Sequence, residues 1–148
     1  MKKCLVALLL VATSTLAFTF GPGFWTQKKR DWAFIQSVGG IQVRVEDQQL
    51  MVDCDVSGTR EVTTKPTVIN SGMGVRKLIH TRKENKIQLT LVTSVIGEGS
   101  RTTPKPVDLS SYPAGSYQVV YRDRDGQEHD LGSIQLVSPL AEPVQPVK

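Results

Sequence analysis

Apolar and polar residues alternate strictly along two neighbouring stretches between residues 41 and 56. Because successive side chains of a β-strand point to opposite faces, this period of two predicts two half-buried strands. Asp47-Gln48-Gln49 separates the two stretches as a turn, so we expect a hairpin with one face against a core. The apolar positions of this hairpin are Ile41, Val43, Val45, Leu50, Val52, Cys54 and Val56.

A second hairpin is predicted from residues 75–82 and 86–96. Its second arm has the most regular pattern in the chain, and one face of it carries Ile87, Leu89, Leu91, Thr93 and Val95. Two further strands have weaker patterns. The first is residues 32–38, which end at Gly39-Gly40, and the second is residues 62–69, where Pro66 favours an edge position.

A third hairpin is predicted within residues 107–137. Asp125-Gly126 suits a two-residue type I′ turn, because both central residues of that turn need positive φ. Such a turn places Arg124 opposite Gln127 and fixes the register of both arms. The opposed pairs are then Tyr117 and Ile134, Val119 and Gly132, Tyr121 and Asp130, and Asp123 and Glu128.

The residues that lead into this third hairpin carry a short motif: Leu109, then Pro113-Ala114-Gly115, then Tyr117. The motif resembles the lead-in to a late strand of bacterial immunoglobulin-like and fibronectin-like sandwich domains. The resemblance implies a sandwich fold in which Tyr117 makes a tyrosine corner, and it implies no ligand. The alternative is that Tyr117 is a core aromatic residue after a turn. The Cys…Trp…Cys pattern of antibody domains is missing, which excludes that closer kinship.

These patterns give about seven or eight strands with turns every ten residues or so, and no amphipathic helix after the N-terminal run. They predict an all-β protein with a single immunoglobulin-like antiparallel β-sandwich over residues 32–138, with a small β-barrel as the alternative. Residues 18–31 are expected to be a mobile N-terminal segment. Residues 139–148 contain three prolines and are expected to be an extended or disordered tail.

The N-terminus has the layout of a secretory signal peptide. Lys2 and Lys3 precede an uncharged apolar run over residues 4–20, and cleavage after Ala17 would remove residues 1–17. We therefore expect an exported protein, periplasmic or extracellular. The alternative is an uncleaved helical anchor at residues 4–20, which would hold the protein in the cytoplasmic membrane.

The formal net charge of +4 does not indicate a nucleic-acid-binding protein, because Lys2 and Lys3 contribute two of these charges. The sequence also carries no zinc-finger spacing, RNA-binding aromatic motif or helix-turn-helix pattern. We expect no nucleic-acid partner, and we expect membrane contact only if the leader stays uncleaved.

Catalytic motifs of the common hydrolases are missing from the sequence, which favours a non-enzymatic protein. Cys54 is a candidate nucleophile with His80 or His129, but it shares a face with Leu50 and Val52 and fits a small core residue better. An enzyme whose site residues are dispersed along the chain stays as an alternative.

Four carboxylates gather near the predicted turn of the third hairpin: Asp123, Asp125, Glu128 and Asp130. In the predicted register Asp123 faces Glu128, and their repulsion would be relieved by a Ca²⁺ ion. Arg122, Arg124 or solvent could screen them instead. Ca²⁺ is the single cofactor that the sequence raises, and the sequence lacks the ligand spacing of an EF-hand.

Basic residues gather on the second hairpin around His80: Arg76, Lys77, Arg82, Lys83 and Lys86. They form a candidate surface for an anionic envelope polymer or lipid head groups, or else lysines that protect a strand edge from aggregation. The sequence therefore predicts a non-catalytic exported module that binds, or structurally supports, an unknown envelope protein or polymer. The alternative is a membrane-anchored accessory subunit.

Overall fold

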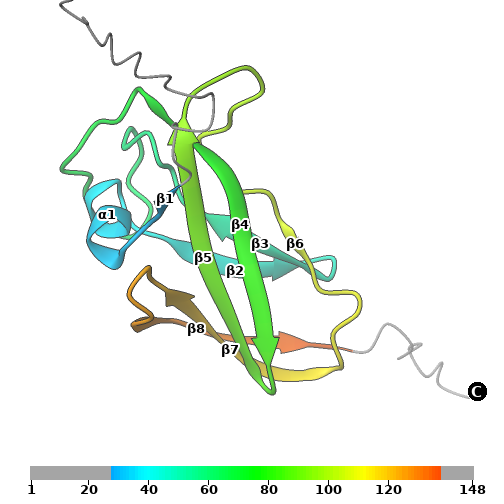
Figure 1. Cartoon of the computed structure of the whole chain (residues 1–148). Helices are drawn as coiled ribbons and strands as arrows, with labels where there is room; N and C mark the ends of the chain where they lie inside the picture. The colour runs from blue at the N-terminus through cyan, green and yellow to red at the C-terminus, as the bar shows by residue number, and fades with distance from the viewer. Residues whose placement is uncertain (1–27, 138–148) are drawn as a thin grey trace, which may run out of the picture.

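The computed structural model describes residues 28–137, which form two β-sheets and one short helix (Figure 1). The all-β fold class is thereby confirmed. The elements in chain order are β1 (Lys28–Lys29), α1 (Trp32–Ser37), β2 (Gln42–Glu46), β3 (Gln49–Asp53), β4 (Met73–Lys83), β5 (Lys86–Val95), β6 (Val107–Asp108), β7 (Gly115–Arg122) and β8 (Glu128–Leu136).

β5 is the central strand of the larger sheet. β4 pairs with one edge of β5 along almost its whole length. The other edge pairs first with β7, from Lys86 opposite Gln118, and then with β1 at Val92 and Thr93. β8 follows β7. The β5–β7 pair is parallel, so the predicted antiparallel arrangement is wrong at this pair.

The smaller sheet has the order β2-β3-β6, and its β2–β3 hairpin was predicted from the alternating pattern. The turn is shorter than expected, because Gln49 already pairs with Glu46. Asp47 and Gln48 form the two-residue loop and both have positive φ, 46° and 60°, as a type I′ turn requires.

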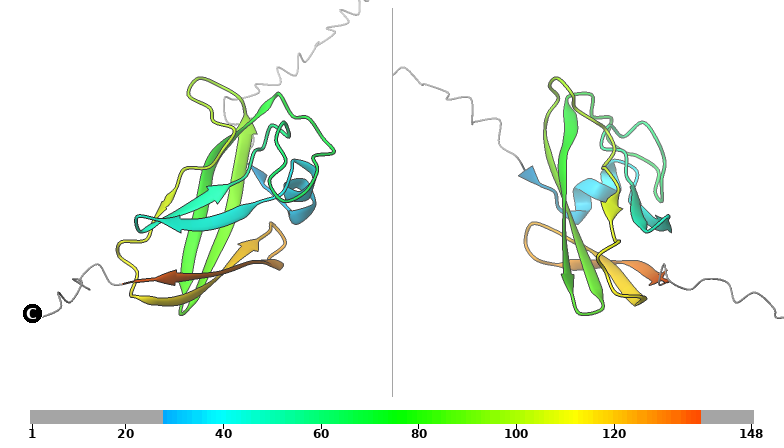
Figure 2. Two further views of the ribbon diagram at one scale, coloured as in Figure 1. Left: turned by 180° about the vertical axis from the view of Figure 1, so that it is seen from behind. Right: turned by 90° about the vertical axis from the view of Figure 1, so that its right-hand side faces the viewer.

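The core lies between the two sheets, and Figure 2 shows the β2–β3 hairpin on one face of the long β4–β5 hairpin. Leu50, Val52, Cys54 and Val56 are all buried, as their alternation predicts. The predicted face of β5 is also buried as far as Thr93, whereas Val95 is 51% exposed at the end of the strand.

The strand predicted at residues 32–38 is wrong, because Trp32–Ser37 form α1. The Asp31 side chain accepts a hydrogen bond from the Phe34 N–H at 2.9 Å and caps the helix. Ile35 and Val38 are fully buried, and their spacing of three residues places both side chains on the same side of a helix. Gly39 and Gly40, with φ of 115° and 85°, follow directly.

The strand predicted at residues 62–69 is also wrong. Its backbone amides bind the carbonyl groups at the end of α1, which have no partner within the helix. Val62 and Thr63 donate to the Gly39 carbonyl at 2.9 Å each, and Thr67 donates to the Ser37 carbonyl at 2.8 Å. This segment therefore closes the C-terminal end of the helix instead of joining a sheet.

The β7–β8 hairpin has the predicted register in its lower half, where Tyr117 faces Ile134 and Val119 faces Gly132. Near the turn the prediction is wrong, because Leu131 is an extra residue in β8 and the loop is longer than two residues. The observed pairs there are Val120 with Asp130, Tyr121 with His129, and Arg122 with Glu128.

The longer loop of this hairpin is stabilised by Asp123. Its Oδ1 atom accepts hydrogen bonds from the N–H groups of Asp125 and Gln127, at 3.0 Å each. Gly126 has a φ of 89°, whereas Asp125 keeps a negative φ, which excludes the expected type I′ turn.

The folded domain begins before the predicted boundary at residue 32. Lys28 and Lys29 pair with β5, and the Arg30 N–H donates to the Leu91 carbonyl at 2.9 Å. Residues 28–31, which belong to the segment expected to be mobile, are thus bonded to β5 and α1. The predicted signal peptide or anchor, residues 18–27 and the tail 139–148 lie outside the described residues. Within residues 28–137 no helix has the length and apolar character needed to cross a membrane.

Candidate functional site

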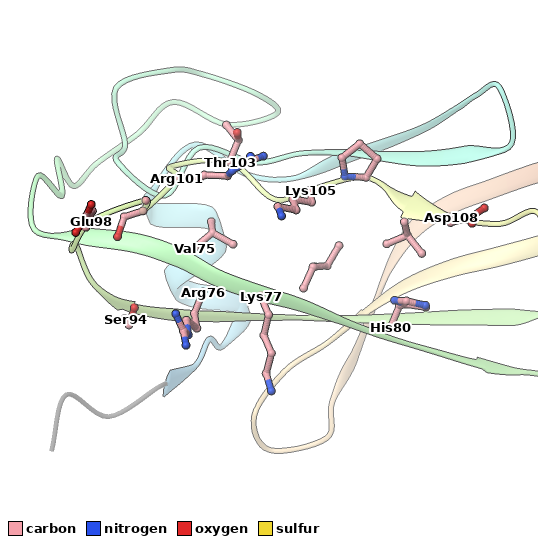
Figure 3. Close-up of a pocket in the computed structure, with 15 residues that line it drawn as sticks. Val75, Arg76, Lys77, His80, Ser94, Glu98, Arg101, Thr103, Lys105 and Asp108 are labelled. Carbon is pink, nitrogen blue, oxygen red and sulfur yellow. The ribbon is translucent and has the colours of Figure 1, made fainter. Parts of the chain in front are cut away.

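A cavity of about 480 Å³ lies between β4 and the segment that returns from β5 to β6. We call residues 97–108 the return segment and this cavity the groove. Figure 3 shows Val75, Arg76, Lys77 and His80 on the β4 wall, and Arg101, Thr103 and Lys105 on the return segment. Along the chain, β5 lies between these two walls.

The groove lies beside a return segment that is bonded to β4 at one point and otherwise to the smaller sheet and the chain that follows it, where the Val56 N–H donates to the Thr102 carbonyl at 3.0 Å. At one end the Val75 N–H donates to the Arg101 carbonyl at 2.6 Å. At the other end β6 pairs with β3, with Val107 opposite Leu50. The return segment thus passes from the edge of β4 to the smaller sheet, and the groove is the space between this segment and β4.

Four exposed cationic side chains line the groove: Arg76, Lys77, Arg101 and Lys105. Among residues 28–137, none of the four forms an ion pair with a carboxylate. Two carboxylates, Glu98 and Asp108, also line the groove. Asp108 accepts the Ser110 N–H at 2.8 Å, and this hydrogen bond holds the pKa of Asp108 below its usual value. Four cations and two carboxylates thus line the groove, an excess of positive charge that favours an anion over a cation.

Arg76 owes its position to a β-bulge in β4. Val75 pairs with Thr93 and Lys77 pairs with Val92, so Arg76 is an extra residue without a partner on β5. Bulges change the direction in which the neighbouring side chains point. In the view of Figure 3 the Lys77 side chain extends away from the return segment.

The other predicted basic residues have different surroundings. The Arg82 guanidinium lies over the Tyr112 ring, 5.4 Å from its centre. Lys86 pairs with Glu128 at 2.7 Å, and Lys83 is exposed at the end of β4. The structure thus brings Arg76 and Lys77 together with two cations that the sequence analysis missed, Arg101 and Lys105. No local pattern in residues 97–106 indicated their position, because it depends on a contact with β4.

No family model matches this chain, and neither a curated protein nor a solved structure matches it. The function has to be inferred from the geometry and charge of the groove.

A second cavity, of about 470 Å³, lies between the β2–β3 turn, the residues that lead into β7 and the end of β8. Val45, Leu109, Tyr112 and Leu136 contribute to its walls, and Asp47 is its one charged lining residue. The lining of this cavity is less polar than that of the groove and includes no cationic side chain, so no positive charge there would attract an anion.

The four carboxylates of the calcium hypothesis each have other partners. Asp123 binds backbone amides and His129, and Glu128 binds Lys86 and Gln88. Asp130 accepts the Gly132 N–H at 3.0 Å, and Asp125 lies 3.4 Å from Arg124. Arg122, not Asp123, faces Glu128, so the repulsion on which the hypothesis was based is absent. In the part of the chain that the structure describes, no group of three or more His, Cys, Asp or Glu side chains could hold a metal ion.

Cys54 is fully buried in the core. Burial is the largest cause that raises the pKa of its thiol, to about 12, and the nearby carboxylates of Asp55 and Asp53 add to this. The thiol is therefore protonated at neutral pH and lacks the electropositive, open surroundings of a reactive cysteine.

His129 takes part in a small cluster that joins α1 to the tip of the β7–β8 hairpin. Its Nε2 atom lies 3.3 Å from Asp123 Oδ2, and its ring stacks on Trp32 with centres 4.5 Å apart. The His129 and Asp123 side chains are only 16% and 8% exposed. This cluster was not predicted from the sequence, because a strand was expected at residue 32 and a different register was expected between β7 and β8 near their turn.

Proposed function

We propose that this protein is a non-catalytic exported module that binds an anionic ligand of the cell envelope in the groove. The observation that carries the proposal is the set of cations on both walls, Arg76 and Lys77 on β4 and Arg101 and Lys105 on the return segment. None of them has a carboxylate partner within residues 28–137, so an incoming anion would not have to displace one.

The dimensions of the groove support the same proposal. Its volume of about 480 Å³ falls in the range of known ligand sites. Its lining is polar and its cations are exposed, which favours a charged ligand bound in contact with solvent rather than an apolar molecule enclosed in the fold. Binding of this kind weakens as salt screens the charges. Export is part of the proposal and is supported by the composition of residues 1–20.

The finer description of the fold also belongs to this proposal. We favour an immunoglobulin-like sandwich because the Tyr117 hydroxyl donates to the Pro113 carbonyl at 2.9 Å. A hydrogen bond from a tyrosine to the backbone a few residues upstream is the defining contact of a tyrosine corner. Because β5 and β7 are parallel, a sandwich of this type would contain one parallel pair of strands.

The proposed function is tested with two polymers that differ in their anionic group, inorganic polyphosphate and polygalacturonate. Calorimetric titration of the full chain should show binding that weakens at least tenfold between about 50 mM and 300 mM salt. The double variant Arg101→Ala/Lys105→Ala should weaken binding about tenfold, because each exposed cation contributes up to about 1 kcal/mol.

The matched control is Lys65→Ala/Arg124→Ala, which removes two exposed cations that do not line the groove. It should leave the affinity unchanged. Equal weakening by both double variants would show that the polymers respond to net charge alone and would contradict the groove as the site. Failure of the unaltered protein to bind any anionic ligand, whether one of these polymers or an acidic peptide, would contradict the proposed function itself.

A further inference from the structure

β4 has one paired edge and one largely free edge. Along Met73–Lys83 its partner is β5, apart from the bulge at Arg76. On the other edge, within the described residues, a single bridge joins Val75 to Arg101. Beyond this bridge, the strand borders the groove through Leu78 and His80.

The register shows which backbone groups face the groove. A two-residue loop joins β4 to β5, and the pair Lys83 and Lys86 closes it. In an antiparallel ladder, residues alternate between pairs that exchange hydrogen bonds and pairs that do not. Counting back from Lys83, the backbone N–H and C=O groups of Arg82, His80 and Leu78 point away from β5. The described residues include no other backbone group bonded to these three.

The return segment cannot itself pair with this edge. Pro104 and Pro106 have no N–H group to donate, and the residues on either side of them are bonded elsewhere: the Thr102 carbonyl accepts the Val56 N–H at 3.0 Å, and Val107 pairs with Leu50 of β3. The prolines thus keep the second wall of the groove apart from β4. At the bridge between Val75 and Arg101 the return segment pairs with β4 as a strand would, but it does not continue this pairing along the edge.

We infer that the free edge of β4, at Leu78, His80 and Arg82, binds an extended acidic peptide segment of a partner protein as an added β-strand. This inference rests on the proposed function, because the peptide is the anionic ligand of the groove. An extended peptide repeats its N–H and C=O groups at the spacing of the strand edge, which a polysaccharide or a lipid does not. Its carboxylates would meet the cations beside the edge: Arg76, Lys77, Lys83, Arg101 and Lys105.

Other occupants fit the edge less well. A second copy of β4 would bring Lys77, Arg82 and Lys83 beside the same cations, and like charges on neighbouring strands repel. Within this chain, residues 1–27 contain no acidic residue. Residues 138–148 contain three prolines and a single glutamate, which is balanced by Lys148. We therefore assign the acidic strand to another protein.

The test uses the full chain and a fluorescent seven-residue peptide that alternates glutamate with valine and threonine. Two control peptides accompany it: the same sequence with every backbone nitrogen methylated, and the same length with lysine in place of glutamate. The acidic peptide should bind, and the methylated peptide should bind at least tenfold more weakly, because it keeps the charges but cannot donate to the edge. The lysine peptide should not bind.

A second measurement locates the binding. At saturation with the acidic peptide, hydrogen exchange of the Leu78, His80 and Arg82 amides should slow at least tenfold, while the exposed amides of the β7–β8 loop keep their rates. The variant Lys77→Glu/Lys83→Glu should lose the peptide. The matched variant Lys65→Glu/Arg124→Glu should keep it, and circular dichroism should be the same for both.

The outcomes separate this inference from the proposed function. If the methylated peptide binds as tightly as its parent, strand addition is overturned and an anion-binding groove still stands. If polyphosphate binds and the acidic peptide does not, the inference fails alone. If neither binds, both fail, and the basic residues of β4 serve to protect its edge from aggregation.

Discussion

At the scale of single residues, Asp123 has the largest number of partners among the carboxylates of the β7–β8 loop. It accepts two backbone N–H groups and contacts His129, which in turn stacks on Trp32. Desolvation acts to raise the pKa of Asp123, but the hydrogen bonds from His129, Gln127 and Asp125 lower it below its ordinary 3.8. The carboxylate therefore connects α1 to the hairpin in its ionised form.

A lowered pKa in the folded state gives a contribution to stability that is present above the unfolded-state pKa and is lost as pH falls through the folded-state value. We predict that Asp123→Asn lowers the urea midpoint at pH 7, and that the difference between the two proteins shrinks as pH falls below 3.8 and through the lowered folded-state pKa. Urea unfolding of both proteins at pH 7 and across this acid range measures this. An unchanged difference between the proteins at acid pH would contradict the ionic role of Asp123.

Burial makes Cys54 unreactive, although its sequence position alone allowed a nucleophilic role. A pKa raised from 9.0 to about 12 reduces the thiolate fraction at pH 8 roughly a thousandfold. We predict that iodoacetamide leaves Cys54 unmodified in the native protein and modifies it fully in denaturant, as measured by peptide mass mapping. Modification of Cys54 at the rate of a free thiol in the native protein would reopen the question of a catalytic cysteine.

At the scale of elements, the turn between β2 and β3 contains a residue that is poorly suited to its conformation. Gln48 has a φ of 60°, a left-handed conformation that disfavours side chains with a Cβ atom. We predict that Gln48→Gly, which creates the preferred Asp-Gly turn, stabilises the protein by about 0.5–1 kcal/mol. Urea unfolding measures the change.

The neighbouring position provides the control for this turn. Gln49 lies in β3 opposite Glu46, where glycine loses entropy without gaining a suitable conformation. Gln49→Gly should therefore destabilise the protein by about 0.5–1 kcal/mol. Two changes of the same sign would mean that the left-handed backbone at Gln48 is not the cause of the effect.

The elements that sequence reasoning predicted correctly are the hairpins whose pattern is local. The alternation around Leu50 and the regular run from Ile87 both mark strands that pack one face on the core. α1 was missed because its short apolar pattern also fits a strand, and the deciding signal was the cap at Asp31. Residues 62–69 were missed because their hydrogen-bond partners, the carbonyls of Ser37 and Gly39, are distant in sequence.

At the scale of the whole molecule, the groove shows why a binding site is harder to predict than a fold. Arg76 could be identified from the sequence as part of a basic cluster, but Arg101 belongs to a stretch without any period. Their proximity follows from the bridge at Val75 and from the path of the return segment toward β3. Both are tertiary features, and neither has a signature in the residues next to these arginines.

The proposal also depends on where the domain is delivered, and this depends on residues outside the described range. The uncharged run at residues 4–20 follows two lysines, and its features favour cleavage after Ala17. We predict that intact-mass measurement of cell fractions finds a soluble species that starts at Phe18. A full-length species confined to the membrane would contradict this. The acidic partner of the β4 edge should then be sought among neighbouring membrane proteins, since an anchored groove meets only partners within reach of the bilayer.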